Sequence, residues 1–219
     1  MKKTINKLLG IPPFNAERQL KSKLANSMWV DANDFNWKAD ILLKNLPHET
    51  KSYFGKVYVD LMMGIESSLK SLIISLSAPS ITPEDAYINA RNKGHKIDAL
   101  YTEVQKLAKK RVKLLSKLDL KILDEAKTLS VNNRYELITF LLFIQEDSLK
   151  RILHADKISS ILNEEFLGEL LKVAIRLSNI AKKSIKKYCD FPGMSGTQAG
   201  ILDKRTKLFY TTLSASKKL

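Results

Sequence analysis

Three histidines and a small number of arginines are the side chains that could carry proton-transfer chemistry on a phosphate ester. Such chemistry needs a histidine that moves protons to and from the reacting oxygens and an arginine that stabilises the charge developing on the phosphate. Arg91 and His95, with three residues between them, form one candidate catalytic pair, and Arg134 is a second candidate partner for His95. His48 has no partner at a recognisable spacing.

A set of polar residues on predicted helices forms a second candidate site. Glu66 and Lys70 are four residues apart, which suits a helical ion pair or, if the pair is buried, a contact that fixes helix register or touches a ligand. His95 is expected to bond a neighbouring carboxylate or carbonyl at a helix start. Arg134 lies near a helix start, where the dipole opposes a cation, so we expect it to bond Asp60, Glu66 or a phosphate.

The sequence predicts neither a metal site nor a cofactor. Cys189 is the one cysteine, and no His/Asp/Glu cluster has ligand spacing. No Gly-rich phosphate loop, nucleophile elbow or dinucleotide fingerprint occurs. A single cysteine fits a reducing cytoplasm, and the longest apolar run, residues 137–144, is far short of the ~20 residues that span a bilayer. We therefore expect a soluble cytoplasmic protein with no membrane partner.

Basic residues outnumber acidic ones, with 37 lysines and arginines against 23 aspartates and glutamates and a formal net charge of +14. They gather in two segments, 106–121 and 172–187, which a rotation of 100° per residue places on one side of a helix, opposite apolar residues. The segment 170–189 contains no acidic residue. The predicted polyanion-binding residues are Lys106, Lys109, Lys110, Lys113, Lys117, Lys172, Arg176, Lys182, Lys183, Lys186 and Lys187.

A row of like charges repels itself unless an anion relieves it, and nucleic-acid phosphates are the commonest such anion. Two alternatives stay open, a solvated lysine-rich face and a membrane surface. Lysine outnumbers arginine and few aromatic residues are interleaved, which argues against base-specific or stacking recognition.

Apolar periodicity, capping residues and prolines predict helices along most of the chain. The longest apolar stripe predicts a spine helix over 49–77 and consists of Phe54, Val57, Leu61, Ile65, Leu69, Leu72 and Leu76. Asn15, Asp34 and Thr82 are predicted N-caps. Further helices are expected over 15–28, 34–46, 82–94, from 95 with a bend near 118–119, from 132 or 133 to 152, and over 156–188.

These elements predict an all-α protein, a multi-helix up-down bundle. Residues 1–48 are expected to form an N-terminal helical extension, 49–190 the bundle core, and 191–219 a loop and an irregular C-terminal tail. In that tail, residues 208–213 suit either a helix or a short strand.

Three landmarks in the core resemble the HEPN domain (higher eukaryotes and prokaryotes nucleotide-binding), a helical bundle of prokaryotic toxin–antitoxin and defence loci. Glu66-x-x-x-Lys70 resembles that family's Glu…Leu-Lys pattern on the spine helix. The segment 94–100, Gly-His-Lys-Ile-Asp-Ala-Leu, resembles its Gly/Thr-His-Asp-Leu-x-x-Leu motif, and Arg134-Tyr135 resembles its later Arg-Tyr pair. The resemblance covers residues 51–154, about half of the chain.

The resemblance implies two classes of function. Catalytic HEPN proteins are metal-independent ribonucleases that carry Arg-x(4–6)-His and meet as dimers, but here the spacing is three residues for Arg91–His95 and two for Arg151–His154. The expectation is therefore a non-catalytic, dimeric binder of RNA or another polyanion, beside a nucleotidyltransferase or antitoxin partner. The alternatives are a divergent ribonuclease that uses Arg91 or Arg134 with His95, and a module that binds only proteins.

Overall fold

The computed structural model describes residues 15–45, 52–109, 111–128, 162–188 and 196–216, and these residues form seven helices and no strand. The all-α prediction is confirmed. The helices are α2 (Ala16–Asn45), α3 (Ser52–Leu76), α4 (Pro83–Asn92), α5 (Ile97–Ala108), α6 (Lys117–Thr128), α9 (Glu164–Tyr188) and α10 (Gly196–Ser216). Within the described ranges, none combines the length and the apolar character that crossing a bilayer requires.

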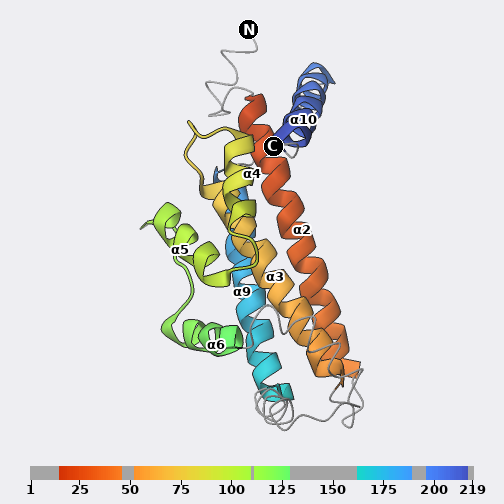
Figure 1. The fold of residues 1–219 in the computed structure, drawn as a ribbon, viewed down its shortest axis with the longest axis vertical. Helices are drawn as coiled ribbons and strands as arrows, with labels where there is room; N and C mark the ends of the chain where they lie inside the picture. The colour runs from red at the N-terminus through yellow and green to blue at the C-terminus, as the bar shows by residue number, and fades with distance from the viewer. Residues whose placement is uncertain (1–14, 46–51, 110, 129–161, 189–195, 217–219) are drawn as a thin grey trace.

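Three long helices, α2, α3 and α9, run side by side, with α4, α5 and α6 along one flank (Figure 1). The first turns of α2 lie at the last turns of the other two long helices. Lys21 Nζ donates to the carbonyl oxygen of Ala78, just after α3, at 2.9 Å, and Arg18 Nε donates to that of Tyr188, the last residue of α9, at 3.0 Å. Helix α2 is therefore antiparallel to α3 and α9.

Helix α3 is the centre of the bundle and packs against α2, α4, α5 and α9. The predicted apolar stripe is confirmed, since every member from Val57 to Leu76 is buried and Phe54 is partly buried. Burying each leucine or isoleucine contributes roughly 1.5–3 kcal/mol. This stripe therefore contributes substantially to the stability of the core.

Helix α2 is one helix of 30 residues, so the predicted end at Met28 and the predicted cap at Asp34 are wrong. Asn15 does cap it, accepting a hydrogen bond from the backbone N–H of Arg18 at 3.1 Å. No glycine or proline lies between residues 28 and 34 to end the helix, and Ala32 and Ala39 are fully buried. Because α2 packs along α3 and α9, it belongs to the core that the structure describes. The division into three domains stays a prediction.

The α4–α5 corner places His95 beside the central helix. Thr82 caps α4 as predicted, its Oγ1 accepting from the backbone N–H of Asp85 at 3.1 Å, with Pro83 in the first turn. Gly94 has φ 59°, a left-handed conformation that favours glycine, and it reverses the chain. Lys96 is still extended, so α5 begins at Ile97, two residues after the predicted start at His95.

The predicted continuous helix through 106–121 is wrong. Helix α5 ends at Ala108, Lys109 adopts φ 47°, and α6 begins at Lys117. Ser116 and Asp119 form a reciprocal cap, with Ser116 N–H to Asp119 Oδ2 at 3.0 Å and Asp119 N–H to Ser116 Oγ at 3.2 Å. The break removes the predicted single lysine row, and Leu118, one of the apolar residues of that segment, is 64% exposed.

Helix α9 begins at Glu164, after Asn163, whose side chain caps it by accepting from Phe166 N–H at 2.8 Å. Residues 162 and 163 are not helical, so α9 does not continue a helix from Asp156; Asp156 itself lies outside the described residues. The predicted irregular tail is also corrected, because 196–216 form α10.

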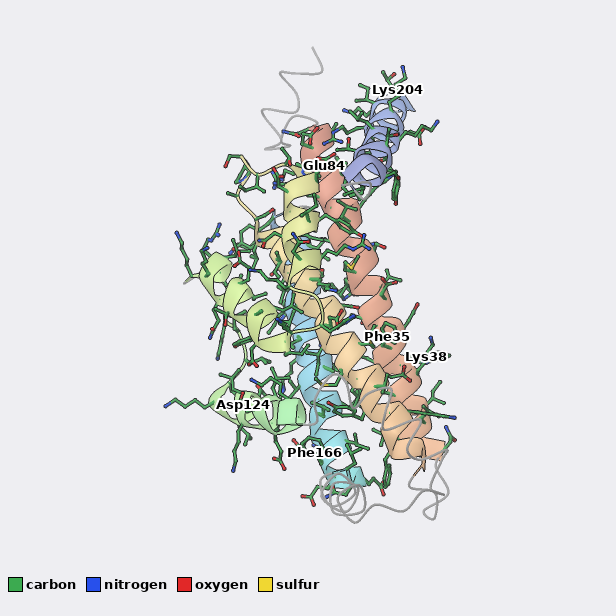
Figure 2. All side chains as sticks on the ribbon, in the orientation of Figure 1. Phe35, Lys38, Glu84, Asp124, Phe166 and Lys204 are labelled. Atoms are coloured by element: carbon green, nitrogen blue, oxygen red, sulfur yellow. The ribbon has the colours of Figure 1, made fainter. Side chains whose placement is uncertain are left out.

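Helix α10 is held to α2 and α4 by one aromatic contact and one charged cluster. Phe209 is fully buried, and its ring meets that of Tyr87 edge to face with centroids 5.5 Å apart. Arg205 pairs with Glu17 of α2 and Glu84 of α4. Figure 2 labels Glu84 at the first turn of α4, and Lys204 farther up, on α10. These contacts give the tail a buried face, which explains why it is a helix.

Candidate polyanion-binding surface

The outer side of α9 carries six cations, which we call the α9 basic face. The inner side of the helix is apolar and buried at Val173, Leu177 and Ala181, so the predicted amphipathic pattern is confirmed. No acidic residue lies between Glu169 and the end of the helix. The members of the α9 basic face are all exposed and are Lys172, Arg176, Lys182, Lys183, Lys186 and Lys187.

A cavity of about 480 Å³ lies between α9 and the connection from α5 to α6; we call it the first cavity. It brings Lys113 of the connection together with Arg176 and Lys183 of α9, so residues from both predicted basic segments meet. The remaining lining is mostly apolar and consists of Val112, Leu114, Leu115, Asp119, Asn179 and Ile180. An anion seated here would meet cationic groups at an apolar wall, where charge interactions are screened less than in open water.

Asp119 holds Arg176 at the edge of the first cavity. Its buried carboxylate accepts from Ser116 and pairs with the Arg176 guanidinium. Burial alone raises the pKa of Asp119, but the hydrogen bonds from Ser116 and the charge of Arg176 more than offset this, and the pKa falls below its ordinary value. Arg176 is therefore partly neutralised. Lys113 and Lys183 form no ion pair with a described carboxylate.

The other predicted cations differ in their surroundings. Lys172 pairs with Glu169, one turn before it on α9. Lys182 lies over the ring of Trp29, 5.0 Å from its centroid, and Lys187 lies over Tyr188, at 5.2 Å. Lys106, Lys109 and Lys117 are exposed and make no ion pair with the described carboxylates. Lys110 lies outside the described residues.

Sequence reasoning missed two residues that α2 adds to this surface. Lys23 and Trp29 line a second cavity together with Lys182 and Lys186 of α9. Helix periodicity within α2 gives no sign of this, because the partners are about 150 residues away along the chain. Only the packing of α2 on α9 reveals it.

Glu66, Lys70 and His95 form a polar cluster at the α3–α5 side of the bundle. Glu66 is 3% exposed; its Oε1 accepts from Lys70 Nζ at 2.7 Å, and its Oε2 lies 2.8 Å from His95 Nδ1. Burial alone raises the pKa of Glu66, but these two hydrogen bonds outweigh burial and the pKa is lowered. The expected carboxylate contact of His95 is confirmed.

An ionised carboxylate only accepts hydrogen bonds, so Nδ1 of His95 carries the hydrogen and Nε2 of the neutral ring is an acceptor. The His95 side chain is 55% exposed. This arrangement can orient a histidine for proton transfer, as a carboxylate does in other carboxylate–histidine pairs.

The other predicted catalytic and polar residues do not join the cluster. Arg91 is exposed at the end of α4, and its guanidinium forms no hydrogen bond or ion pair with the described residues. Asp60 lies six residues before Glu66, about 240° around α3. Burial raises its pKa, and the charge of Lys38 opposes this. Arg134, like His48 and His154, lies outside the described residues.

In the ranges that the structure describes, no group of three His, Cys, Asp or Glu side chains could hold a metal ion. Comparison with known proteins adds no identity: no family model, no curated protein and no solved structure matches the chain.

Proposed function

We propose that this protein is a non-catalytic helical binder of RNA or another polyanion, of HEPN type, and that the α9 basic face and the first cavity form its binding surface. One observation carries the proposal: Lys113, Arg176 and Lys183, from two separate segments, line one cavity. The alternative of a lysine-rich face that is only solvated predicts lysines spread over a surface without a recess. Cations that meet at a recess with an apolar wall and the amide of Asn179 favour a bound anion instead.

The resemblance to HEPN domains extends this proposal to a biological setting. The chain would work in a toxin–antitoxin or defence system, as a homodimer, with a nucleotidyltransferase or an antitoxin protein as partner. These proposals rest on the landmarks at Glu66, Lys70 and residues 94–100.

The experiment is fluorescence anisotropy with a labelled single-stranded RNA at about 50 to 200 mM salt, since counterion release makes phosphate binding salt-dependent. We expect the Lys113→Glu/Lys183→Glu variant to lose at least about tenfold in affinity. The matched control, Lys204→Glu/Lys207→Glu on α10, changes the net charge equally and lies outside the first cavity. Equal losses of RNA affinity in both variants would mean that the attraction is non-specific. If the wild-type protein binds no RNA, the proposal is wrong and the alternative of a module that binds only proteins is favoured.

A second candidate function, a divergent metal-independent ribonuclease, is favoured by the Glu66–His95 contact. The proton-transfer role requires cleavage of structured RNA in the presence of a chelator, abolished by His95→Ala. Intact RNA after long incubation, together with salt-sensitive binding, supports the non-catalytic binder.

A further inference from the structure

We infer that the ligand is a single-stranded nucleic acid and that one of its bases stacks against Trp29 in the second cavity, between α2 and α9. This inference rests on the proposed function and names the form of its ligand. It also revises the expectation, based on the few aromatic residues among the lysines, that stacking plays no part. Trp29 lies outside the two lysine-rich segments, so that expectation did not take it into account.

The second cavity has a volume of about 330 Å³ and is built from two packed helices. Helix α2 contributes positions three and four residues apart, which share one side of a helix. Helix α9 contributes three residues from adjoining turns. The lining residues are Ser22, Lys23, Asn26, Trp29, Lys182, Ile185 and Lys186. All lie within helices, so the site is held by the bundle itself.

The chemistry of the lining suits one nucleotide unit. The indole of Trp29 offers an aromatic face, and Lys182 lies over that ring. A base that stacks on this face takes the place of the ammonium group, which moves aside to a flanking phosphate. Lys23 and Lys186 add two charges for the flanking phosphates. Asn26 carries both a donor and an acceptor that can meet a base edge. Binding of single strands without strict sequence preference uses this combination of cations and an aromatic platform.

A single strand fits better than a duplex for two reasons. In a duplex the bases are stacked on one another inside the helix, so none can reach the indole without unpairing. In addition, Lys182 and Lys183 are neighbours on α9 and point about 100° apart, so the two cavities flank the same helix. Arg176 and Lys186 are ten residues apart, about 15 Å along the helix. A flexible strand that crosses α9 can reach both cavities.

The experiment uses tryptophan fluorescence as a direct reporter. The chain has 2 tryptophans, and Trp37→Phe leaves Trp29 alone. We expect a short oligouridine to quench Trp29 emission, whereas a duplex of matched length does not. In the parent protein, Trp29→Ala should weaken single-strand binding by about tenfold and leave duplex binding unchanged, with Trp29→Phe restoring most of the affinity. Trp37→Ala, which alters a 64% exposed indole, is the matched control.

Trp29 also packs against the core, so Trp29→Ala is first checked for a native circular dichroism spectrum, and Lys186→Glu replaces it if folding fails. If the RNA leaves Trp29 emission unquenched but its binding is still weakened by Lys113→Glu/Lys183→Glu, the stacking inference is wrong and the proposed function stands. A duplex that binds as tightly as the single strand overturns it as well. Absence of any binding overturns both this inference and the proposed function.

Discussion

Asp119 joins two helices, because its carboxylate caps the first turn of α6 and pairs with the guanidinium of Arg176 on α9. The same contact supports the fold and reduces the positive charge at the first cavity. Stability and anion binding therefore place opposite demands on this residue. A substitution that removes its charge separates the two effects.

Asp119→Asn should lower the free energy of unfolding by about 1–3 kcal/mol, because a buried charge-assisted contact is lost. The same change should raise RNA affinity, since Arg176 is released from its carboxylate partner. Urea denaturation and anisotropy measure the two quantities. Asp124→Asn on α6 makes the same change of charge at an exposed site, and an equal gain in affinity there would contradict the role of Arg176.

Glu66 predicts a pH dependence of stability. Its pKa is lowered in the folded protein, so the stabilisation that it provides is present above the pKa of the unfolded chain, about 4.3, and is lost as the pH falls through the folded value. Glu66→Gln should cost about 1–3 kcal/mol at pH 7, with the difference from wild type shrinking in acid.

Urea unfolding of wild type and Glu66→Gln, followed from pH 7 into acid, measures this difference. The pKa values of Glu84 and Asp119 are lowered as well, but both residues are present in the two proteins, so their effects cancel in the comparison. Glu125→Gln, at an exposed position on α6, serves as the control. A gap between wild type and Glu66→Gln that stays constant with pH would mean that Glu66 acts through packing alone.

Gly64 allows α2 and α3 to approach closely. A Cβ at position 64 would lie 2.2 Å from Asn36 Oδ1, so Gly64→Ala should cost about 1–3 kcal/mol in denaturant unfolding. The amide of Asn36 is buried and has no hydrogen-bond partner among the described residues. Asn36→Ala should therefore be less costly, and the double variant should recover most of the loss.

A double-mutant cycle of these two positions measures their coupling. After Asn36→Ala, the nearest remaining atom to a Cβ at position 64 is the Ala32 carbonyl oxygen, at 3.3 Å. Additive costs in the double variant would show that the backbone of Ala32, rather than the Asn36 side chain, sets the helix separation.

Arg205 fastens α10 to the rest of the described structure. Hydrogen bonds from its guanidinium to Glu84 and Glu17 raise the pKa of Arg205. Arg205→Ala removes charge-assisted contacts worth about 1.5–3 kcal/mol, so local opening of α10 should increase by at least about tenfold. Hydrogen exchange by mass spectrometry should show faster exchange in 197–216 and unchanged protection in α3. Lys204→Ala, on the same helix, should leave the exchange unaltered.

The sequence predicts those elements whose signal lies within one helix. The apolar stripe of α3, the cap and proline at Thr82 and Pro83, and the two-sided pattern of α9 all appear in the structure. Long unbroken amphipathic segments carry enough periodic positions to fix both type and face. The Glu66–His95 contact was predicted in part: the sequence indicates that His95 bonds a carboxylate or a carbonyl, and the structure identifies the partner as Glu66.

The errors arise where local signals compete with packing. Asp34 has the type of a capping residue, but the neighbouring Ala32 and Asn36 are buried in tight contact with α3, and the helix continues. At Lys109 no glycine or proline marks the end of α5. The start of α6 is capped by Ser116 and Asp119, and Asp119 also pairs with Arg176, which is distant in the chain. The contact between Trp29 and Lys182 of α9 also joins residues that are distant in the chain, so no local pattern predicts it.

One wall of the first cavity is a connecting segment, residues 111–116, and the other is a helix of the bundle. Insertions or deletions in such a segment are tolerated far more readily than changes within packed helices. Evolution, or an engineer, can therefore resize the recess by loop length alone while α3 and α9 stay in place. Ligand preference can therefore change with the length of this segment, whereas the stability of the bundle depends mainly on its packed helices.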